Sequence, residues 1–379
     1  MRKISVTFIL AVLMIGGFIF VTTMKSSSAK VESLVSTSVV STKVLNNKSK
    51  CSVPAPTTAQ GWFKKLTSLK RRWAAADQVS TVKTNKDGVV FMFGDTVQGR
   101  LKGTRVKNHK FPHNSFAVLN KGCMKFQANV IPDENNGFTY FWPISGKFVK
   151  NELLVFVQQV NHFKGTPELE GTRIAHLEFE NNALKFKKWT MLPSTYFKPV
   201  DRPQWGASMF DSNDGWTYVY GTKQSLVPLE FGRELYVSRN KNISDPAKWE
   251  YWNGTGWVMN ADAAKPIHAA AGGVSASFSS FQNADGSVTL VTKKDDFLGD
   301  TVVSLRGSTP FGSFVETELF KSPSNMTTGD VTYTVLAHPE LELSSGKTLI
   351  TVSRNNLDGK KVIADYRRGR PKFMEINLP

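Results

Sequence analysis

Five copies of one short pattern predict an all-β protein, a five-bladed β-propeller with four-stranded antiparallel blades. Each copy is a turn followed by a strand of alternating or consecutive apolar residues. The copies lie roughly 60–70 residues apart, a spacing that suits one four-stranded blade. Long helical periodicity is nearly absent after residue 73, which favours strands over helices. The copies read DGVVFMFGDT from 87, KNELLVFVQQ from 150, DGWTYVYGTK from 214, DGSVTLVTKK from 285 and SGKTLITVSRN from 345.

The chain begins with a segment that is typical of exported proteins. Arg2 and Lys3 precede an apolar run that extends from Ile4 to about Val21. This run is long for a signal peptide and close to the length that spans a bilayer. Residues 1–24 are therefore expected to form either a cleaved signal peptide or a membrane anchor. Both alternatives predict an extracytoplasmic protein, secreted or anchored in the membrane.

A linker and a short helix are expected between this leader and the propeller. Residues 25–60 are rich in Ser, Thr, Val, Lys and Pro and have too few large apolar residues to form a core. Residues 61–72 predict an amphipathic helix with its apolar side chains on one side. The two cysteines, Cys51 and Cys123, either pair in an oxidising compartment or stay as separate thiols.

Each predicted blade contains four strands, of which the first is innermost. Together they make a propeller domain over residues 61–379. In the first blade we expect strands at 75–83, 89–96, 115–120 and 124–130, and in the second at 139–145, 152–159, 172–178 and 184–190. The third has strands at 205–210, 216–222, 234–238 and 249–252, and the fourth at 274–281, 287–293, 301–305 and 314–320. The fifth has strands at 332–341, 348–353, 362–366 and 373–377.

The formal net charge of +17 bears on the partners of an exported protein. Such a protein meets anionic wall polymers and lipid head groups, to which basic patches would bind; the alternative is solvated surface charge with no partner. Nucleic acid is not expected, because the chain shows no interleaved basic and aromatic motif. We expect a monomer. Much of the charge lies at Lys64, Lys65, Lys70, Arg71 and Arg72 and at Arg100, Lys102, Arg105, Lys107 and Lys110.

Two aspartates of the first blade are the leading candidates for catalysis. In a propeller, the starts of the inner strands and the ends of the second strands meet at one mouth of the central channel. Counting back from the turn at 85–88 places Asp77 and Asp95 opposite each other, where Cβ atoms are about 5 Å apart. Such closeness separates the pKa values of two carboxyls, as acid–base chemistry requires. The alternative is that each Asp caps a turn or accepts backbone N–H bonds.

Other polar and aromatic residues at these strand ends are candidates for binding substrate. Trp142 could stack on a sugar face or belong to the core. His338, with Glu340 nearby, could orient a ligand, hold a water-coordinated structural ion or lock its strand; no other cofactor is expected. The remaining candidates are Gln158, Trp205, Arg354 and Asn355.

Several catalytic motifs are absent from the sequence. It contains no GxSxG, no HExxH, no P-loop and no Rossmann fingerprint. This absence argues against serine hydrolases, zinc peptidases and nucleotide-dependent enzymes.

Several segments resemble a bacterial extracytoplasmic family that was long described only as a domain of unknown function. The segments are DGVVFMFGDT with the upstream Asp77, then HNSFAV, WGASMF, LYVSRN and AHPEL. The family is related to five-bladed propeller glycosidases of the arabinanase and furanosidase type, and some of its members are endo-acting arabinofuranosidases. The resemblance covers about residues 73–379 and is most specific at FGDT and HPEL.

The resemblance implies hydrolysis of a glycosidic bond by paired carboxylates. Asp77 would match the base or nucleophile on the inner strand of the first blade, and Asp95 the Asp of the GDT motif. Asn114, Trp205 and His338 would match positions that contact substrate or line the channel.

One part of the relatives' machinery has no direct counterpart in this sequence. Arabinanase-type relatives carry a general-acid Glu on a middle blade, whereas the third blade here has no Glu on its inner strand. Glu340 or Asp201 is the expected substitute. The position after Asp77, where those relatives carry Gly, holds Gln78.

Two functions follow from these observations. The first is an exported glycoside hydrolase that acts on a cell-wall or capsular polysaccharide, possibly of arabinan type. One carboxyl would protonate the leaving oxygen while the other attacks the sugar or activates water. The alternative is a non-catalytic propeller that binds carbohydrate, an anionic polymer or a partner protein.

Overall fold

The computed structural model describes residues 54–84, 88–163, 166–296 and 298–379. The expected leader at residues 1–24, most of the expected linker and Cys51 lie outside these ranges. Cys123 is disulfide-bonded. Within the described ranges, no helix combines the length and the apolar character that crossing a membrane would require.

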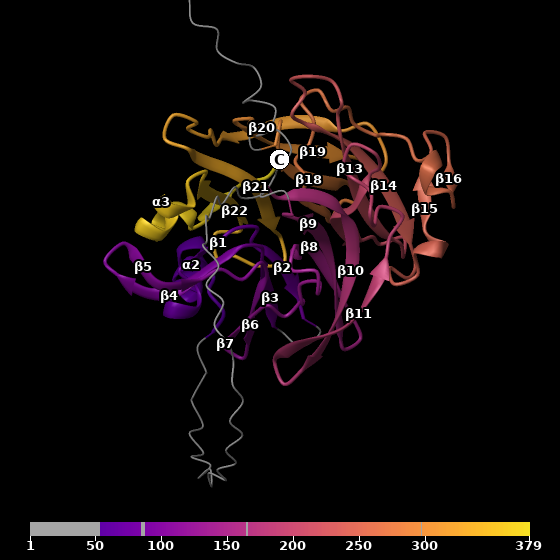
Figure 1. The fold of residues 1–379 in the computed structure, drawn as a ribbon. Helices are drawn as coiled ribbons and strands as arrows, with labels where there is room; N and C mark the ends of the chain where they lie inside the picture. Colours follow the sequence, from indigo (N-terminus) through magenta and orange to yellow (C-terminus); the bar gives the residue numbers. More distant parts are fainter. Residues whose placement is uncertain (1–53, 85–87, 164–165, 297) are drawn as a thin grey trace, which may run out of the picture.

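The fold is all-β, and in the described part of the chain five antiparallel sheets follow one another in sequence (Figure 1). The first comprises β2 (Ser80–Lys83), β3 (Val89–Phe93), β6 (Ser115–Asn120) and β7 (Cys123–Ala128), and the second β8 (Thr139–Val149), β9 (Glu152–Asn161), β10 (Glu168–Glu180) and β11 (Ala183–Met191). The third comprises β12 (Gln204–Asp211), β13 (Thr217–Gln224), β14 (Arg233–Asn240), β15 (Glu250–Trp252) and β16 (Trp257–Val258). The fourth comprises β17 (Ser279–Gln282), β18 (Val288–Lys293), β19 (Thr301–Gly307) and β20 (Val315–Lys321), and the fifth β21 (Asp330–His338), β22 (Thr348–Asn356) and β23 (Lys372–Ile376).

The first strands of the sheets contact one another in cyclic order. Strand β2 contacts β8, β8 contacts β12, β12 contacts β17, and β17 contacts β21. The contact between β21 and β2 closes the series. The sheets therefore stand in a ring, with their first strands on the inside. All these strands start at one end of the ring, and each second strand returns to that end.

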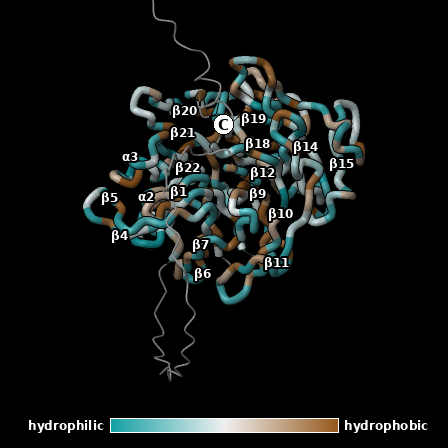
Figure 2. Tube along the Cα trace, in the orientation of Figure 1, coloured by the Kyte–Doolittle hydropathy of each residue, from teal (hydrophilic) through white to brown (hydrophobic). Residues whose placement is uncertain are grey.

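Apolar side chains fill the space between neighbouring sheets. All five residues of β3, VVFMF, are buried, because the sheet has a neighbour on each face. Phe91 and Phe93 pack with Leu349 of the fifth sheet, whereas Val90 and Met92 pack with Val155 of the second. Figure 2 shows hydrophilic stretches on loops at the edge of the molecule.

A short helix, which the sequence predicted over residues 61–72, packs against the first and fifth sheets. Helix α2 (Ala59–Thr67) is followed by the 3₁₀ turn η1 (Lys70–Arg72). Its N-cap Thr58 accepts a hydrogen bond from the Gly61 N–H, which satisfies one free donor of the first turn. Trp62 is buried against Phe91, with ring centroids 5.4 Å apart. The N–H of Ala59 donates to Glu375 of β23 at 2.8 Å.

A small sheet outside the repeat was not predicted. Strands β1 (Ala75–Ala76), β4 (Thr96–Lys102) and β5 (Arg105–Lys110) form it, with β4 in the middle. Strands β4 and β5 make a hairpin that projects from one edge of the molecule, near α2 and α3 (Figure 1).

Three expected strands differ in the structure. The expected strand at 362–366 is wrong, because Gly359–Ala364 forms helix α3, whose N-cap Asp358 accepts from the Lys360 N–H, followed by the 3₁₀ turn η4 (Tyr366–Gly369). The expected strand at 274–281 shrinks to β17, because Thr292 and Asp296 side chains hold the N–H groups of Ser275 and Ala276. The strand at 75–83 is broken at residues 77–79.

Candidate active site

Asp77 and Asp95 lie side by side at the end of the ring where the first strands begin. Asp77 occupies the break between β1 and β2, and Asp95 lies between β3 and β4. The Asp77 N–H donates to the Asp95 carbonyl at 3.2 Å, and the Gly94 N–H donates to the Asp77 carbonyl at 3.2 Å. The two residues are therefore opposite each other, as the register counted from the sequence predicted.

The break after Asp77 is built into the backbone. Gln78 has a φ of 50°, a left-handed conformation that is uncommon for a residue with a side chain. Its N–H donates to the Ser353 hydroxyl at 2.9 Å. Gly94 leaves room for the Asp77 carboxyl, because a Cβ at Gly94 would lie 2.6 Å from Asp77 Oδ1. This local geometry turns the Asp77 side chain toward the end of β3.

Donors from the fifth sheet hold the Asp77 carboxyl. The Tyr333 hydroxyl on β21 donates to Asp77 Oδ2 at 2.6 Å, and Asn355 Nδ2 on β22 donates to the Tyr333 oxygen at 3.1 Å. Asp77 is 6% exposed. Burial raises the pKa of Asp77 well above its usual value and the charge of Asp95 raises it further, while the Tyr333 hydrogen bond opposes both. The surroundings of Asp77 therefore favour its protonated form.

Donors from the first and second sheets hold the Asp95 carboxyl. Trp142 Nε1 on β8 donates to Asp95 Oδ1 at 2.9 Å, and His113 Nδ1 lies 2.9 Å from the same oxygen. Burial lowers the pKa of His113, but the hydrogen bond to Asp95 and the charges of Asp95 and Asp133 raise it by more, so that the net change is upward. The His113 imidazole and the Trp142 indole N–H therefore converge on the same oxygen of Asp95.

The aromatic ring of Tyr140 closes one side of this cluster. It stacks on His113, with ring centroids 3.7 Å apart and planes inclined by 14°. Burial raises the pKa of Tyr140, and the charges of Asp95, Asp133 and Asp77 raise it further. The phenol therefore stays neutral beside the carboxyl pair.

The arrangement places two buried carboxyls side by side. Asp77, whose protonated form is favoured, lies next to Asp95, whose Oδ1 has Trp142 Nε1 and His113 Nδ1 within hydrogen-bond distance. Two neighbouring carboxyls can act as general acid and base when their surroundings give them different pKa values.

Of the residues predicted to bind substrate, three lie at or near this pair. Trp142 contacts Asp95 directly, and Asn355 reaches Asp77 through Tyr333. Gln158 is the cross-strand neighbour of Trp142 and is buried.

Asn114 and Trp205 have structural contacts instead. The Asn114 side chain donates to the Ile131 carbonyl at 2.9 Å and accepts from the Ile131 N–H at 3.0 Å, so its amide is engaged with the backbone. Trp205 is 1% exposed and packs against Tyr251 and Phe156 between the second and third sheets. No described contact joins either side chain to Asp77 or Asp95.

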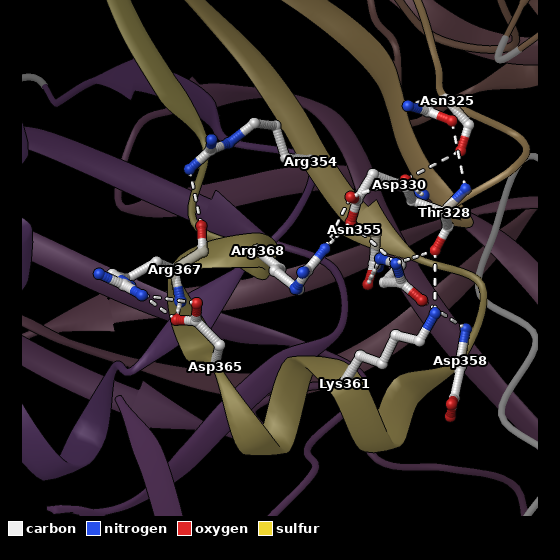
Figure 3. A network of polar contacts seen from close by, with 11 residues as sticks. Asn325, Thr328, Asp330, Arg354, Asn355, Asp358, Lys361, Asp365, Arg367 and Arg368 are labelled. Atoms are coloured by element: carbon white, nitrogen blue, oxygen red, sulfur yellow. Dashed lines mark hydrogen bonds and ion pairs between the residues drawn. The ribbon is translucent and has the colours of Figure 1, made fainter. Parts of the chain in front are cut away.

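Arg354 is held by the C-terminal segment. Its Nε donates to the Arg370 carbonyl and its Nη2 to the Arg367 carbonyl, each at 2.7 Å. Figure 3 shows the second of these contacts beside a network around Asp330. The guanidinium therefore braces the turn η4 rather than reaching the aspartates.

His338 and Glu340 lie at the opposite end of the ring. Tyr333, which contacts Asp77, precedes His338 by five positions on β21, or about 17 Å at 3.3 Å per residue. Glu340 follows the strand, and both residues line a cavity of about 110 Å³ with Thr81, Ser145 and other residues of the five first strands. The structure therefore does not bring Glu340 to the carboxyl pair.

Both ring nitrogens of His338 are engaged by hydroxyls. Its Nδ1 lies 2.5 Å from Thr81 Oγ1 and its Nε2 lies 2.8 Å from Thr351 Oγ1. Burial lowers the pKa of His338 to about 3. These contacts fit the alternative in which His338 locks its strand, and they leave neither nitrogen for an ion. No cluster of potential metal ligands occurs among the described residues.

The expected substitute acid Asp201 is also away from the pair. It lies in the turn before β12, where its N–H donates to the Lys198 carbonyl at 2.9 Å. No described contact joins it to Asp77 or Asp95.

Comparison with known families matches residues 61–377 to the family described as "Domain of unknown function (DUF5005)". The chain belongs to the DUF5005 family. The match contains the entire carboxyl cluster and all five sheets. No curated protein matches the chain by sequence.

Among solved structures, a provisionally assigned hydrolase from Bacteroides ovatus is similar over 83% of this chain and 88% of its own, with 16% identity and a TM-score of 0.64. This likeness shows a shared fold. An endo-arabinase from Bacteroides thetaiotaomicron matches over 82% and 97% of the two chains with 10% identity and a TM-score of 0.48. A protein of unknown function from Dyadobacter fermentans matches over 81% and 84% with 11% identity and a TM-score of 0.46.

Three residues of the candidate site were not predicted from the sequence: His113, Tyr140 and Tyr333. His113 begins the HNSFAV segment, in which only its neighbour Asn114 was predicted as a site residue. Tyr140 could have been found as the residue that shares a strand face with Trp142, two positions later. Tyr333 carried no signal, because only the closure of the ring brings β21 beside Asp77.

Proposed function

We propose that this protein is an exported glycoside hydrolase that acts on a cell-wall or capsular polysaccharide through Asp77 and Asp95. The observation that carries the proposal is the pairing of two buried carboxyls, one of which, Asp77, has a raised pKa beside the charge of the other. We also infer that the five sheets are the blades of a five-bladed propeller, with this pair at the mouth of its channel.

In the proposed reaction, Asp77 is the general acid, which reverses the role of base or nucleophile that the resemblance implied, because burial and the charge of Asp95 raise its pKa. Its proton passes to the glycosidic oxygen as the bond from that oxygen to the anomeric carbon breaks. Asp95 supplies the electron pair, either by attacking the anomeric carbon directly or by removing a proton from the water that attacks it. In the direct route, water then hydrolyses the glycosyl–Asp95 ester, and Asp77 takes up the proton of that water. The direct route restores the starting protonation states. The water route leaves Asp77 ionised and Asp95 protonated, and exchange of one proton with solvent at each carboxyl restores the starting states before the next turnover.

The neighbouring side chains have positioning roles in this scheme. Trp142 and His113 hold the Asp95 oxygen and stabilise its charge before attack. Tyr333, supported by Asn355, holds one oxygen of Asp77 and leaves the other oxygen to carry the proton. The arabinan-type substrate is suggested by the resemblance of FGDT and the neighbouring segments to arabinanase relatives, and the shared fold with the Bacteroides ovatus protein is compatible with it.

Product release from a panel of arabinan-type and other wall polysaccharides tests the proposal. Wild-type protein should generate new reducing ends from at least one polymer, and the Asp77→Asn and Asp95→Asn variants should each lower the rate by at least about a thousandfold. Asp300→Asn, at an exposed position with the same chemical change, should leave the rate unaltered. Retained activity in Asp77→Asn would remove Asp77 from the acid role.

A second function, carbohydrate binding without hydrolysis, is favoured by the low exposure of both carboxyls, 6% for Asp77 and 3% for Asp95. In that case the same panel would show saturable binding to a polymer with no new reducing ends. Asp77→Asn would then leave both measurements unchanged.

A further inference from the structure

The β4–β5 hairpin has one face that anchors it to the molecule. Val97 and Val106 are buried together with Ala75 and Val362 in a single apolar cluster, and Leu101 packs against that cluster. Leu101 and Val106 are cross-strand partners. Because side chains alternate along a strand, the residues on either side of Leu101 and Val106 point to the other face.

That other face carries four cations. Arg100 lies directly opposite Lys107, and Lys102 lies directly opposite Arg105. All four residues are exposed. Like charges at directly opposed positions destabilise a strand pair, and the hairpin has two such pairs in succession. We refer to these four residues as the cationic face.

The cationic face has no compensating anions. None of its four residues forms an ion pair with another described residue, whereas exposed lysines on the outer strands of other sheets do. Lys187 of β11 pairs with Glu178 at 3.0 Å, and Lys321 of β20 pairs with Glu318 at 3.4 Å. The adjoining turn η1 adds Lys70, Arg71 and Arg72, and Gln98 of β4 donates to the Arg72 carbonyl at 3.1 Å. The surface therefore concentrates positive charge that the protein does not neutralise itself.

The backbone holds this face in a fixed position. At the hairpin tip, the Thr104 carbonyl accepts from the Tyr366 N–H at 3.1 Å, and the Thr104 hydroxyl donates to the Ala364 carbonyl at 3.2 Å. At the base, Gly99 has a φ of 150°, and a Cβ there would lie 2.6 Å from Val106 Cγ1. These contacts fix the hairpin in place, so binding would require little further ordering.

The hairpin starts at the candidate active site. Strand β4 begins at Thr96, directly after Asp95, and pairs there with Ala76, directly before Asp77. Arg100 is five residues beyond Asp95, or about 17 Å along an extended strand. An extended polymer that occupies the site can therefore continue along the cationic face.

We propose that the cationic face binds an anionic polysaccharide, as the part of the polymer that extends beyond the reacting sugar. Because the hairpin starts at the carboxyl pair, a chain-like ligand can contact both the pair and the cationic face. A membrane surface is less well suited, because interfacial binding draws on exposed apolar side chains and the described hairpin has no exposed large hydrophobic residue. That the bound polymer is also the substrate rests on the proposed function. That the cationic face binds an anionic polysaccharide does not.

Binding should be measured with the full chain carrying Asp77→Asn, so that turnover cannot alter the polymer. The probes are polygalacturonate, a phosphodiester-linked glycerol polymer and neutral arabinan, with phosphatidylglycerol vesicles as a fourth arm. The first two distinguish carboxylate from phosphate recognition. The test variant adds Arg100→Gln, Lys102→Gln, Arg105→Gln and Lys107→Gln. The matched control instead adds Lys187→Gln, Lys248→Gln, Lys294→Gln and Lys321→Gln, which removes the same charge from positions outside the hairpin.

We expect the parent to bind at least one anionic polymer, with affinity falling as salt shortens the screening length from about 30 Å at 0.01 M to about 8 Å at 0.15 M. The test variant should bind that polymer at least about tenfold more weakly, and the control within about twofold of the parent. The melting temperature of the test variant should be unchanged or higher, because opposed like charges have been removed.

Four results would overturn the proposal. They are the absence of binding to both anionic polymers, equal binding by the test variant, an equal loss in the control, and a preference for vesicles over both polymers. Because no turnover is measured, a failure of hydrolysis in the other experiment would leave these results interpretable.

Discussion

Asp77 and Asp95 are joined through their main chains, yet their carboxyls take hydrogen bonds from different sheets. The Asp77 N–H donates to the Asp95 carbonyl at 3.2 Å, while Tyr333 of the fifth sheet holds one carboxyl and Trp142 of the second sheet holds the other. The closing contact of the ring, between the last sheet and the first, thus completes the surroundings of the proposed acid. Four predictions follow from this relationship and from its neighbours.

Asp77→Asn should stabilise the protein at neutral pH while abolishing hydrolysis. The pKa of Asp77 is raised in the folded state, so the stability that Asp77 contributes is complete below its ordinary pKa of 3.8 and is lost as pH rises through the folded pKa. Asparagine carries no such penalty. The melting temperature should rise by about 2 °C or more at pH 7, and the gain should disappear below pH 4.

The control for this prediction is Asp300→Asn. The Asp300 pKa is lowered by the Thr301 hydroxyl, so no gain is expected at pH 7. A gain in Asp77→Asn that did not change with pH would contradict the assignment of a buried, protonated Asp77.

Tyr333→Phe should shift the pH dependence of hydrolysis as well as its rate. The Tyr333 hydrogen bond lowers the pKa of Asp77, so its removal raises that pKa further. A general acid then stays protonated to higher pH, and the alkaline limb of the kcat profile should move upward. The maximal rate should fall roughly tenfold, because the carboxyl loses its orienting donor.

Tyr251→Phe is the matched control for Tyr333→Phe. The Tyr251 hydroxyl is buried and has no hydrogen-bond partner among the described residues, so its loss should change neither kcat nor the pH profile. An unshifted alkaline limb in Tyr333→Phe would separate Tyr333 from the acid.

Trp142→Phe should lower kcat by about tenfold or more with a smaller effect on KM. The substitution removes one of the two donors to Asp95 Oδ1 and leaves a buried carboxylate with His113 alone. Trp249→Phe provides the comparison, because the Trp249 indole is also buried but its Nε1 has no partner in the described part of the chain. If both variants lost the same activity, packing rather than the indole N–H would explain the loss.

Glu340→Gln should keep kcat within about twofold of wild type, because Glu340 lies at the end of the ring opposite the carboxyl pair. Its effect should appear in stability. Burial raises the pKa of Glu340 to about 7, although a hydrogen bond from Thr81 opposes this. Stability from this group is present below pH 4.5 and is lost as pH rises through about 7.

Urea denaturation at pH 5 and pH 8 measures how much the free energy of unfolding falls between the two pH values. Wild type should lose more stability than Glu340→Gln between the two, by a modest amount because the side chain is 22% exposed. A collapse of kcat in Glu340→Gln would restore Glu340 as a candidate acid.

Much of the sheet architecture was predictable from local pattern. Runs such as VVFMF and LLVFV become strands buried on both faces, and the register of β2 on β3 places Asp77 opposite Asp95. The local sequence pattern gave wrong strands where side chains, rather than a neighbouring strand, bind the backbone N–H groups. Thr292 and Asp296 hold the segment before β17, and Asp358 caps a helix where β-branched residues had indicated a strand.

Sequence by itself determined the repeated sheets, the short helix α2 and the identity of the two central carboxyls, because these depend on spacing between residues that are near in the chain. Tertiary structure alone decided which groups surround them. Tyr333 is separated from Asp77 by 256 positions and meets it only when the ring closes. The same closure places Glu340 far from the carboxyl pair. Strand β21 passes Asp77 near its start, so the residues that follow it lie at the opposite end of the ring.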